Sequence, residues 1–168
     1  MAMRGWYNPA DGTLLDHPRE MWSQCFELGV AAITYDDVQD DDFTKYSRDN
    51  PPDGWSKLAS SRKHSLSCFI YQMQVGDVIY VKQAGLIIGR GVVASDYHFD
   101  LVGPIPGDLN TKWRHQRRVG WCRNFEPRTV SIGNTQRPTI VSLTAADVAR
   151  VEQSSRAPSA PAPKAPNP

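Results

Sequence analysis

The chain has 168 residues, of which 19 are Lys or Arg and 18 are Asp or Glu, giving a formal net charge of +1. This length fits one domain with its own core, and the balanced charge excludes a uniformly basic coat protein for nucleic acid. The three cysteines are widely spaced, which argues against a disulfide framework or a zinc site and favours a reducing cytoplasm. No stretch is apolar enough for a signal peptide or a membrane helix, so we expect a cytoplasmic protein that does not enter a membrane.

Local patterns predict an α+β domain over residues 1–152, built as a small, strongly curved mixed sheet or barrel flanked by short helices. Short apolar runs predict buried strands, Pro18 is typical of a helix start, and Gly29 is typical of a helix end. Thr144 is a natural N-cap, with Asp147 at the capping-box position. The predicted strands are residues 5–7, 30–35, 77–82, 86–94, 117–123 and 129–132, and the predicted helices are 18–28, 65–73 and 144–151.

Three further segments carry local predictions. Gly89 and Gly91 lie two apart on one predicted strand, which indicates a close approach to the backbone. Residues 36–61 hold seven Asp and few large apolar side chains, so we expect a long surface loop. Its acids would suit a divalent cation, but a solvated acidic loop is the favoured interpretation. The Ala/Pro-rich residues 153–168 are expected to be disordered, either as a linker to another domain or as a frayed end.

No catalytic motif stands out in the sequence. The four histidines form none of the spacings that bind a metal, and there is no nucleophile elbow and no glycine-rich phosphate loop. We therefore predict no catalytic residue, no metal and no cofactor, and a binding domain rather than an enzyme.

A basic segment over residues 112–128 predicts a surface for nucleic acid. It holds six Lys or Arg against one acid, and aromatic residues lie among them. Basic side chains bind phosphates, and planar side chains stack on bases. The alternative is a strand with basic residues outward and Trp121 in the core. The predicted backbone contacts are Lys112, Arg114, Arg117, Arg118 and Arg128, with Arg62 and Lys63 as a second basic point.

Aromatic residues also lie on the first predicted helix and at or just after the ends of predicted strands. Trp22, Tyr35, Tyr97 and Phe99 would meet at the rim of a small barrel, where converging rings form a cage for one flat ligand or a flipped base. For each ring taken singly the core is the favoured interpretation, with the cage as the alternative.

Six motifs follow one another in an order that is specific as a set. They are W-x-x-C (22–25), GVAAI-x-Y (29–35), KHSL (63–66), VGDVIYVK (75–82), IIGRGVV-x-SDY (87–97) and RRV-x-W (117–121). This order resembles the EVE and YTH-like branch of the PUA superfamily, and the resemblance covers roughly residues 4–150. It implies a PUA-like curved mixed sheet and a non-catalytic reader that flips a modified base into an aromatic cage.

Relatives in that branch read N6-methyladenine in RNA or modified cytosine in DNA, several of them as modules of modification-dependent restriction systems. The resemblance therefore implies a DNA-binding reader of methylcytosine or a larger modified cytosine, with a fused or partner nuclease. An RNA reader of a base such as N6-methyladenine is the alternative, and a small nucleotide-acting enzyme is a further one. The loop at residues 131–137 lacks the acid found in YTH domains, which disfavours N6-methyladenine. The implied pocket residues are Trp22, Tyr35 and Ser65, with Tyr97, Phe99 and Trp113 as alternatives for the second ring of the cage. Arg137 joins the backbone contacts.

Overall fold

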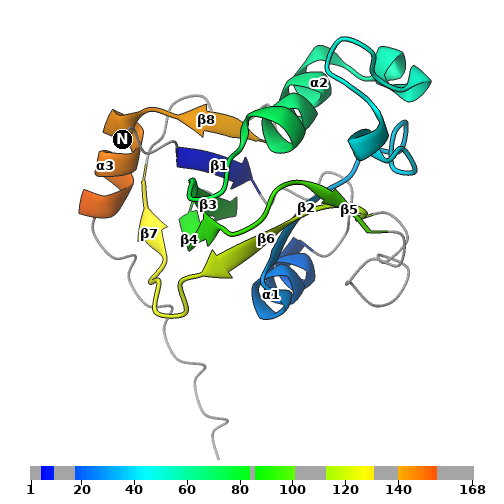
Figure 1. Cartoon of the computed structure of the whole chain (residues 1–168). Coiled ribbons are helices and arrows are strands. Elements are labelled where there is room, and N and C mark those ends of the chain that lie inside the picture. The colour runs from blue at the N-terminus through cyan, green and yellow to red at the C-terminus, as the bar shows by residue number, and fades with distance from the viewer. Residues whose placement is uncertain (1–4, 10–17, 84–85, 101–112, 131–139, 155–168) are drawn as a thin grey trace, which may run out of the picture.

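The computed structural model describes residues 5–9, 18–83, 86–100, 113–130 and 140–154 as one mixed sheet with helices packed around it (Figure 1). This architecture confirms the α+β prediction. In chain order the main elements are β1 (Gly5–Pro9), α1 (Pro18–Leu28), β2 (Val30–Ile33), α2 (Ser60–Ser67), β3 (Val78–Gln83), β4 (Leu86–Val93), β5 (His98–Phe99), β6 (His115–Trp121), β7 (Arg128–Thr129), β8 (Val141–Leu143) and α3 (Ala145–Gln153).

The strand order of the sheet is β2-β6-β4-β3-β1-β8, with β5 pairing to β6 and β7 to β4. β1 runs parallel to β3, with Gly5 opposite Val78, and the other pairs are antiparallel. Within the described ranges no pairing joins β2 to β8, so the sheet is open. The prediction of a mixed sheet is confirmed, whereas the closed-barrel alternative is wrong for this part of the chain.

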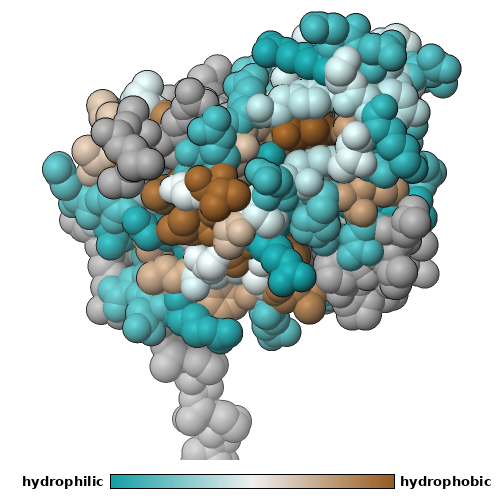
Figure 2. Space-filling view, viewed as in Figure 1, coloured by the Kyte–Doolittle hydropathy of each residue, from teal (hydrophilic) through white to brown (hydrophobic). Residues whose placement is uncertain are grey.

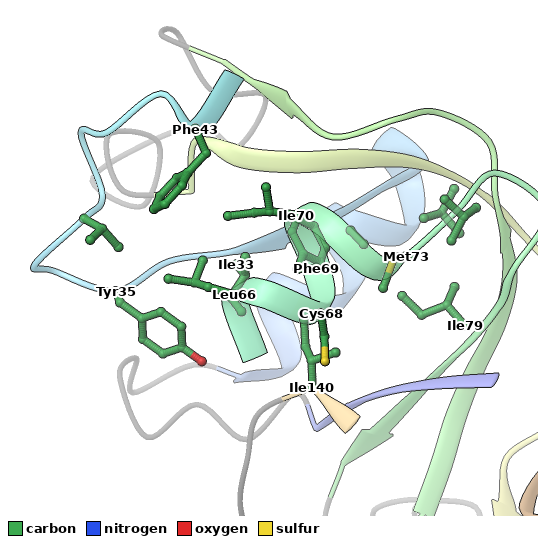
Figure 3. Packing of buried hydrophobic residues seen from close by; sticks show 14 of the residues in the cluster. Ile33, Tyr35, Phe43, Leu66, Cys68, Phe69, Ile70, Met73, Ile79 and Ile140 are labelled. Carbon is green, nitrogen blue, oxygen red and sulfur yellow. The ribbon is translucent and has the colours of Figure 1, made fainter. Parts of the chain in front are cut away.

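Side chains alternate between the two faces along each strand, which gives the sheet two cores. Val78 and Tyr80 on β3 lie in a cluster with Val148 and Val151 of α3. Ile79, between them, belongs to the larger cluster that includes the side chains of α2 and the turn after it (Figure 3). The sheet is therefore covered by α3 on one face and by α2 on the other.

The two glycines of β4 make room for aromatic rings. A Cβ atom at position 89 would lie 2.3 Å from the ring of Trp22, and one at position 91 would lie 2.6 Å from the ring of Trp121. Trp22 and Trp121 also contact each other edge to face, with ring centroids 4.9 Å apart. The predicted close approach is confirmed, and it lets α1 pack its tryptophan directly on the backbone of β4.

The helix predicted over residues 65–73 begins earlier than expected. α2 starts at Ser60, and the chain continues from it into one π-helical turn, η3 (Cys68–Gln72), before leaving the helix at Met73. The sequence SSRK at its start lacks the apolar spacing that located the rest of the helix. Its N-cap residue, Ala59, has no side-chain acceptor that would mark the helix start.

The segment between β2 and α2 is more ordered than the predicted surface loop. It contains two 3-10 turns, η1 (Phe43–Lys45) and η2 (Asp53–Lys57). Val38, Phe43 and Leu58 are buried in the larger core cluster. Gly54 lies so close to the loop that a Cβ atom there would be 2.0 Å from the Asp37 carbonyl oxygen. The many acids of this segment suggest a solvated loop, but three of its apolar side chains are buried in the core and hold it against the domain.

The C-terminal helix agrees with the prediction. Thr144 caps α3, and the backbone N–H of Asp147 donates to its Oγ1 at 3.1 Å while the backbone N–H of Thr144 donates to Asp147 Oδ2 at 3.1 Å. The helix ends at Gln153, one residue beyond the predicted domain boundary. The predicted disordered tail falls almost wholly outside the described residues, which end at Ser154.

The last turn of α3 is tied to the sheet by polar contacts. The Tyr80 hydroxyl donates to the Glu152 carboxylate, and Arg90 Nε donates to the same carboxylate oxygen at 2.8 Å. Burial raises the pKa of Tyr80, and so do the hydrogen bond to Glu152 and the negative charge of that carboxylate. The Tyr80 hydroxyl therefore stays protonated. α3 is therefore held by directional bonds as well as by its apolar face.

The surface mixes polar and apolar residues, with an apolar patch over β3 and β4 (Figure 2). Exposed Val92 is on β4, and exposed Val75 lies just before β3. All three cysteines are free thiols, which confirms that no disulfide stabilises the domain. Among the described helices, none combines the length and the apolarity needed to cross a membrane.

The glycine contact at β4 predicts a specific stability difference. Gly89→Ala should lower the free energy of unfolding by about 1–3 kcal/mol, as overpacked core sites do, because the new Cβ meets the Trp22 ring. Gly120→Ala on the neighbouring strand is the control, since the nearest atom there is 3.9 Å away. Denaturant titration of both variants checks the expectation. Equal losses would mean that α1 does not depend on this contact.

Candidate nucleic-acid interface

Tyr35, the central residue of the predicted cage, lies just beyond the end of β2. Its side chain is only 3% exposed and belongs to the larger core cluster, at the margin of the residues shown in Figure 3. The guanidinium carbon of Arg62 lies 5.5 Å from the centre of its ring. Its hydroxyl is buried and has no hydrogen-bond partner within the described part of the chain. The expected open pocket wall is therefore closed in this structure.

Tyr97 and Phe99, two other predicted cage residues, do meet, and they meet at His115. The His115 ring is stacked on Tyr97 at 6.0 Å between centroids and lies 5.5 Å from Phe99 and 5.5 Å from Phe43. Tyr97 and Phe99, two of the alternatives for the second cage ring, are therefore both packed against His115 of the protein itself.

His115 also fixes the loop that follows Tyr35. The Tyr97 hydroxyl is 2.9 Å from His115 Nδ1, and His115 Nε2 donates to the Val38 carbonyl at 3.0 Å. The Val38 carbonyl can only accept, so Nε2 carries a proton. In the neutral ring, which burial favours, Nδ1 then accepts from the Tyr97 hydroxyl. The Val38 backbone N–H in turn donates to the Tyr35 carbonyl at 3.0 Å. Tyr97 and Phe99 thus hold His115 in place, and His115 in turn holds the loop that follows Tyr35.

The remaining predicted pocket residues are distributed elsewhere. Trp22 contacts Phe26 and Trp121 on the α1 side of the sheet, and Trp113 packs against a separate small cluster around Cys25. Ser65 is fully buried, and its Oγ donates to the Ser61 carbonyl and accepts the Ile140 backbone N–H at 3.1 Å each. The structure therefore places Trp22, Trp113 and Ser65 in different packed surroundings, and a role for them in ligand binding stays a prediction.

Arg117 is the clearest correction to the predicted phosphate contacts. It is 2% exposed, because it points from β6 to the same face as Val119. Its guanidinium donates to the carbonyls of Phe69 at 2.7 Å and Ile70 at 3.0 Å, and to the Ser95 carbonyl at 3.1 Å. Arg117 therefore binds the end of a helix and cannot contact a nucleic-acid backbone.

The other predicted cations have varied surroundings. Arg114 pairs with Asp40, and Arg128 Nη1 donates to the Val151 and Glu152 carbonyls at the end of α3. Lys63 Nζ donates to the Ser56 carbonyl at 3.2 Å. The side chain of Arg118 is exposed on β6. Lys112 and Arg137 lie outside the described residues.

The acidic loop does not form a cation site. Asp42 caps η1 by accepting the Thr44 backbone N–H at 3.0 Å, while Asp40 is paired to Arg114. Burial, followed by the charges of Asp40 and Asp53, raises the pKa of Asp41. In the described ranges there is no group of three or more His, Cys, Asp or Glu side chains placed to hold a metal ion.

A family model matches residues 10–145, which is most of the chain. Its description is a domain of unknown function, DUF8426. The chain belongs to the DUF8426 family. No curated protein sequence matches the chain. The matched part of the DUF8426 domain runs from just after β1 to the first residue of α3, so it contains Tyr35, Arg62 and the His115 cluster.

Sequence reasoning missed several residues that shape this part of the DUF8426 domain. Phe43 and Trp55, which contact each other at 5.7 Å, come from the loop expected to be solvated. His115 was not selected, although alternation along β6 places it on the same face as Arg117 and Val119. That period of two was the available signal for its burial.

The environment of His115 predicts a pH dependence of stability. Burial lowers its pKa to about 4, against an ordinary value of 6.5. Between these two pH values the imidazole is protonated in the unfolded chain but not in the folded chain. The free energy of unfolding therefore falls as the pH drops from about 6.5 towards 4. One such proton changes stability by at most roughly 1.4 kcal/mol per pH unit. Chemical denaturation between pH 6.5 and 5 measures this slope, and His115→Gln should flatten it. An unchanged slope in that variant would contradict the assignment.

The two neighbouring arginines of β6 predict opposite behaviour. Arg117→Met leaves the buried Phe69 and Ile70 carbonyls and the partly buried Ser95 carbonyl without this donor. Each buried unsatisfied group costs about 1–3 kcal/mol, so stability should fall by at least about 2 kcal/mol. Arg118→Met is the matched control on the same strand, and its exposed position predicts a change within about 0.5 kcal/mol. Thermal and denaturant unfolding compare the two. Similar losses for both variants would rule out a special role for Arg117.

Proposed function

We propose that this DUF8426 domain is a non-catalytic reader of a modified nucleobase, which it takes out of the stack and holds against Tyr35. The observation that carries the proposal is the state of Tyr35. Its ring lies at the end of β2 beneath one movable cation, and its hydroxyl is buried with no partner in the described part of the chain. A planar ring with an unused hydrogen-bonding group beside it is suited to a flat ligand with polar edges.

The unpaired hydroxyl is informative because burying such a group is costly. A buried donor or acceptor without a partner costs about 1–3 kcal/mol, and native proteins keep few of them. The Thr34 hydroxyl, next in the chain, is also buried and unpartnered among the described residues. A ligand that reached the Tyr35 hydroxyl would supply its missing partner, which favours a binding role for this end of β2.

Cations beside Tyr35 would hold the nucleic-acid backbone. Arg62 and Lys63 lie in the first turn of α2, and Lys63 uses only one of its donors on the Ser56 carbonyl. Such side chains bind phosphates without reading sequence. Exposed Arg118 on β6 offers a further positive charge, whereas Arg114 would first have to exchange Asp40 for a phosphate.

A Cys–His pair lies in the helical segment formed by α2 and η3. Cys68 Sγ is 3.5 Å from His64 Nε2, the arrangement of a nucleophile and its base. However, burial raises the pKa of the Cys68 thiol, which disfavours the thiolate that such chemistry needs. This pair therefore supports packing better than catalysis.

The choice of base rests on the ordered motifs that resemble EVE and YTH-like domains. They favour methylcytosine or a larger modified cytosine in DNA, within a PUA-like fold, as the recognition module of a modification-dependent restriction protein with a fused or partner nuclease. The mixed sheet, with α2 beside the end of β2, is compatible with such a fold. RNA carrying a modified base is the other substrate to be compared.

Binding of matched oligonucleotides tests the function. DNA and RNA of one sequence, each plain or carrying 5-methylcytosine, 5-hydroxymethylcytosine or N6-methyladenine, should be titrated at one fixed salt concentration, since phosphate contacts make affinity salt-dependent. We expect tighter binding of a DNA with modified cytosine than of its plain counterpart. Equal affinity for all modified and plain strands would refute a reader of modified bases.

Tyr35→Phe separates a ligand-binding hydroxyl from a structural one. Because the hydroxyl lacks a partner in the described structure, its removal should leave stability unchanged or raise it. Loss of one hydrogen bond of about 0.5–1.5 kcal/mol should weaken binding of the preferred oligonucleotide by about 2- to 12-fold. Tyr71→Phe is the control, because its hydroxyl is also buried and unpartnered among the described residues but lies at the other end of the helical segment. Equal binding by both variants would argue against Tyr35 as the contact.

A further inference from the structure

Arg62 occupies the position in which a base would stack on Tyr35. Its guanidinium carbon lies 5.5 Å from the centre of the Tyr35 ring. A flat ring stacked between two planar groups lies about 3.5–4.0 Å from each of them. The flanking groups must then be about 7–8 Å apart, so no base fits between Tyr35 and Arg62 as they stand.

The covered face is the one through which a ligand would reach the ring. Tyr35 belongs to the larger core cluster and is almost fully buried, so its remaining surface is in contact with the protein interior. Arg62, by contrast, is partly exposed. Access to the ring therefore depends on the Arg62 side chain rather than on the core.

The side chain of Arg62 is free to move without disturbing the helix. Its backbone N–H donates to the Ala59 carbonyl at 2.9 Å, which fixes the first turn of α2 independently of the guanidinium. Within the described ranges, the contact of the guanidinium is the Tyr35 ring, and no carboxylate is paired with it. A cation over an aromatic face gains about 0.5–1 kcal/mol at an exposed site and about 2 kcal/mol when it is desolvated. The Tyr35 ring is buried and Arg62 is partly exposed, so a stacking base of about 1–3 kcal/mol competes with the cation, and a new phosphate partner for the guanidinium favours the exchange.

We propose that Arg62 is a specificity-determining residue that holds the place of the base in the unliganded protein and exchanges it for a phosphate on binding. This inference rests on the proposed function. The guanidinium leaves the ring as the flipped base arrives and then binds a phosphate of the same strand. The site therefore favours an uncharged flat base within a strand, whose phosphate can take up the displaced Arg62. A free nucleoside binds more weakly, because it must displace Arg62 without offering it a new partner.

The test compares Arg62→Ala with wild type on two probes, one with phosphates and one without. The nucleoside probes are 5-methyl-2′-deoxycytidine, 5-hydroxymethyl-2′-deoxycytidine and N6-methyl-2′-deoxyadenosine, followed by NMR titration, and the second probe is the preferred oligonucleotide of the binding panel. Arg62→Ala should bind the preferred nucleoside about two- to thirty-fold more tightly, because a competing cation–π contact of about 0.5–2 kcal/mol is gone. It should bind the oligonucleotide more weakly, with a salt slope reduced by about 0.7–0.9 for the lost phosphate contact.

Lys63→Ala is the matched control, because it removes the neighbouring charge, which does not cover the ring. Because a nucleoside has no phosphate for Lys63 to bind, this variant should leave nucleoside affinity unchanged, while its oligonucleotide affinity should fall as a phosphate contact is lost. Thermal unfolding of both variants confirms that they are folded. If wild type binds the modified oligonucleotide but Arg62→Ala shows unchanged or weaker nucleoside binding, the exchange is refuted while the reader function stands. If wild type binds no oligonucleotide and no nucleoside, the proposed function fails, and the exchange fails with it.

Discussion

The guanidinium of Arg117 sets the position of most groups around the candidate site. The last four carbonyls of a helix have no partner within it, and the helical segment that begins with α2 ends facing the sheet. Arg117 satisfies the carbonyls of Phe69 and Ile70 there, and its positive charge is favourable at a helix C-terminus. The helix end is thereby held against β6.

This contact has consequences at the other end of the helix. β6 pairs with β2, and Arg117 itself lies opposite Ala31, so the strand that leads to Tyr35 and the helix that carries Arg62 share one reference point. His115, two residues before Arg117, holds the loop beyond Tyr35 through the Val38 carbonyl. The closeness of Arg62 to Tyr35 follows from these two residues of β6.

Features that depend on neighbours in the chain could be predicted from the sequence. The Thr144 cap, the β3–β4 hairpin and the end of α1 at Gly29, whose φ is 65°, all follow from the conformational preferences of a few adjacent residues. The need for Gly89 and Gly91 was also predictable, because missing side chains at that spacing leave one strand face open. The identity of the ring that fills the space, Trp22, depends on how α1 packs and could not be predicted locally.

The candidate site was harder to predict because its residues are placed by distant contacts. Arg117 was assigned to the surface on its charge, yet the alternation of β6 puts it on the same face as buried Val119. A buried guanidinium needs several acceptors, and here they come from a helix far away in the sequence. The position of Tyr35 at the end of a buried strand could be predicted from the sequence. The contact of Arg62 with its ring could not, because it depends on how α2 packs on the sheet.

The bonds at the end of α3 have a mechanical consequence. Ser154 leaves the helix with its backbone N–H donating to the Val151 carbonyl, and the adjacent Glu152 is bound by Tyr80 of β3 and Arg90 of β4. These two strands are the middle pair of the six-strand path. A pulling force applied at Ser154 would therefore be transmitted to the two central strands through the contacts of Glu152 with Tyr80 and Arg90. It would not simply detach α3 from an edge of the sheet.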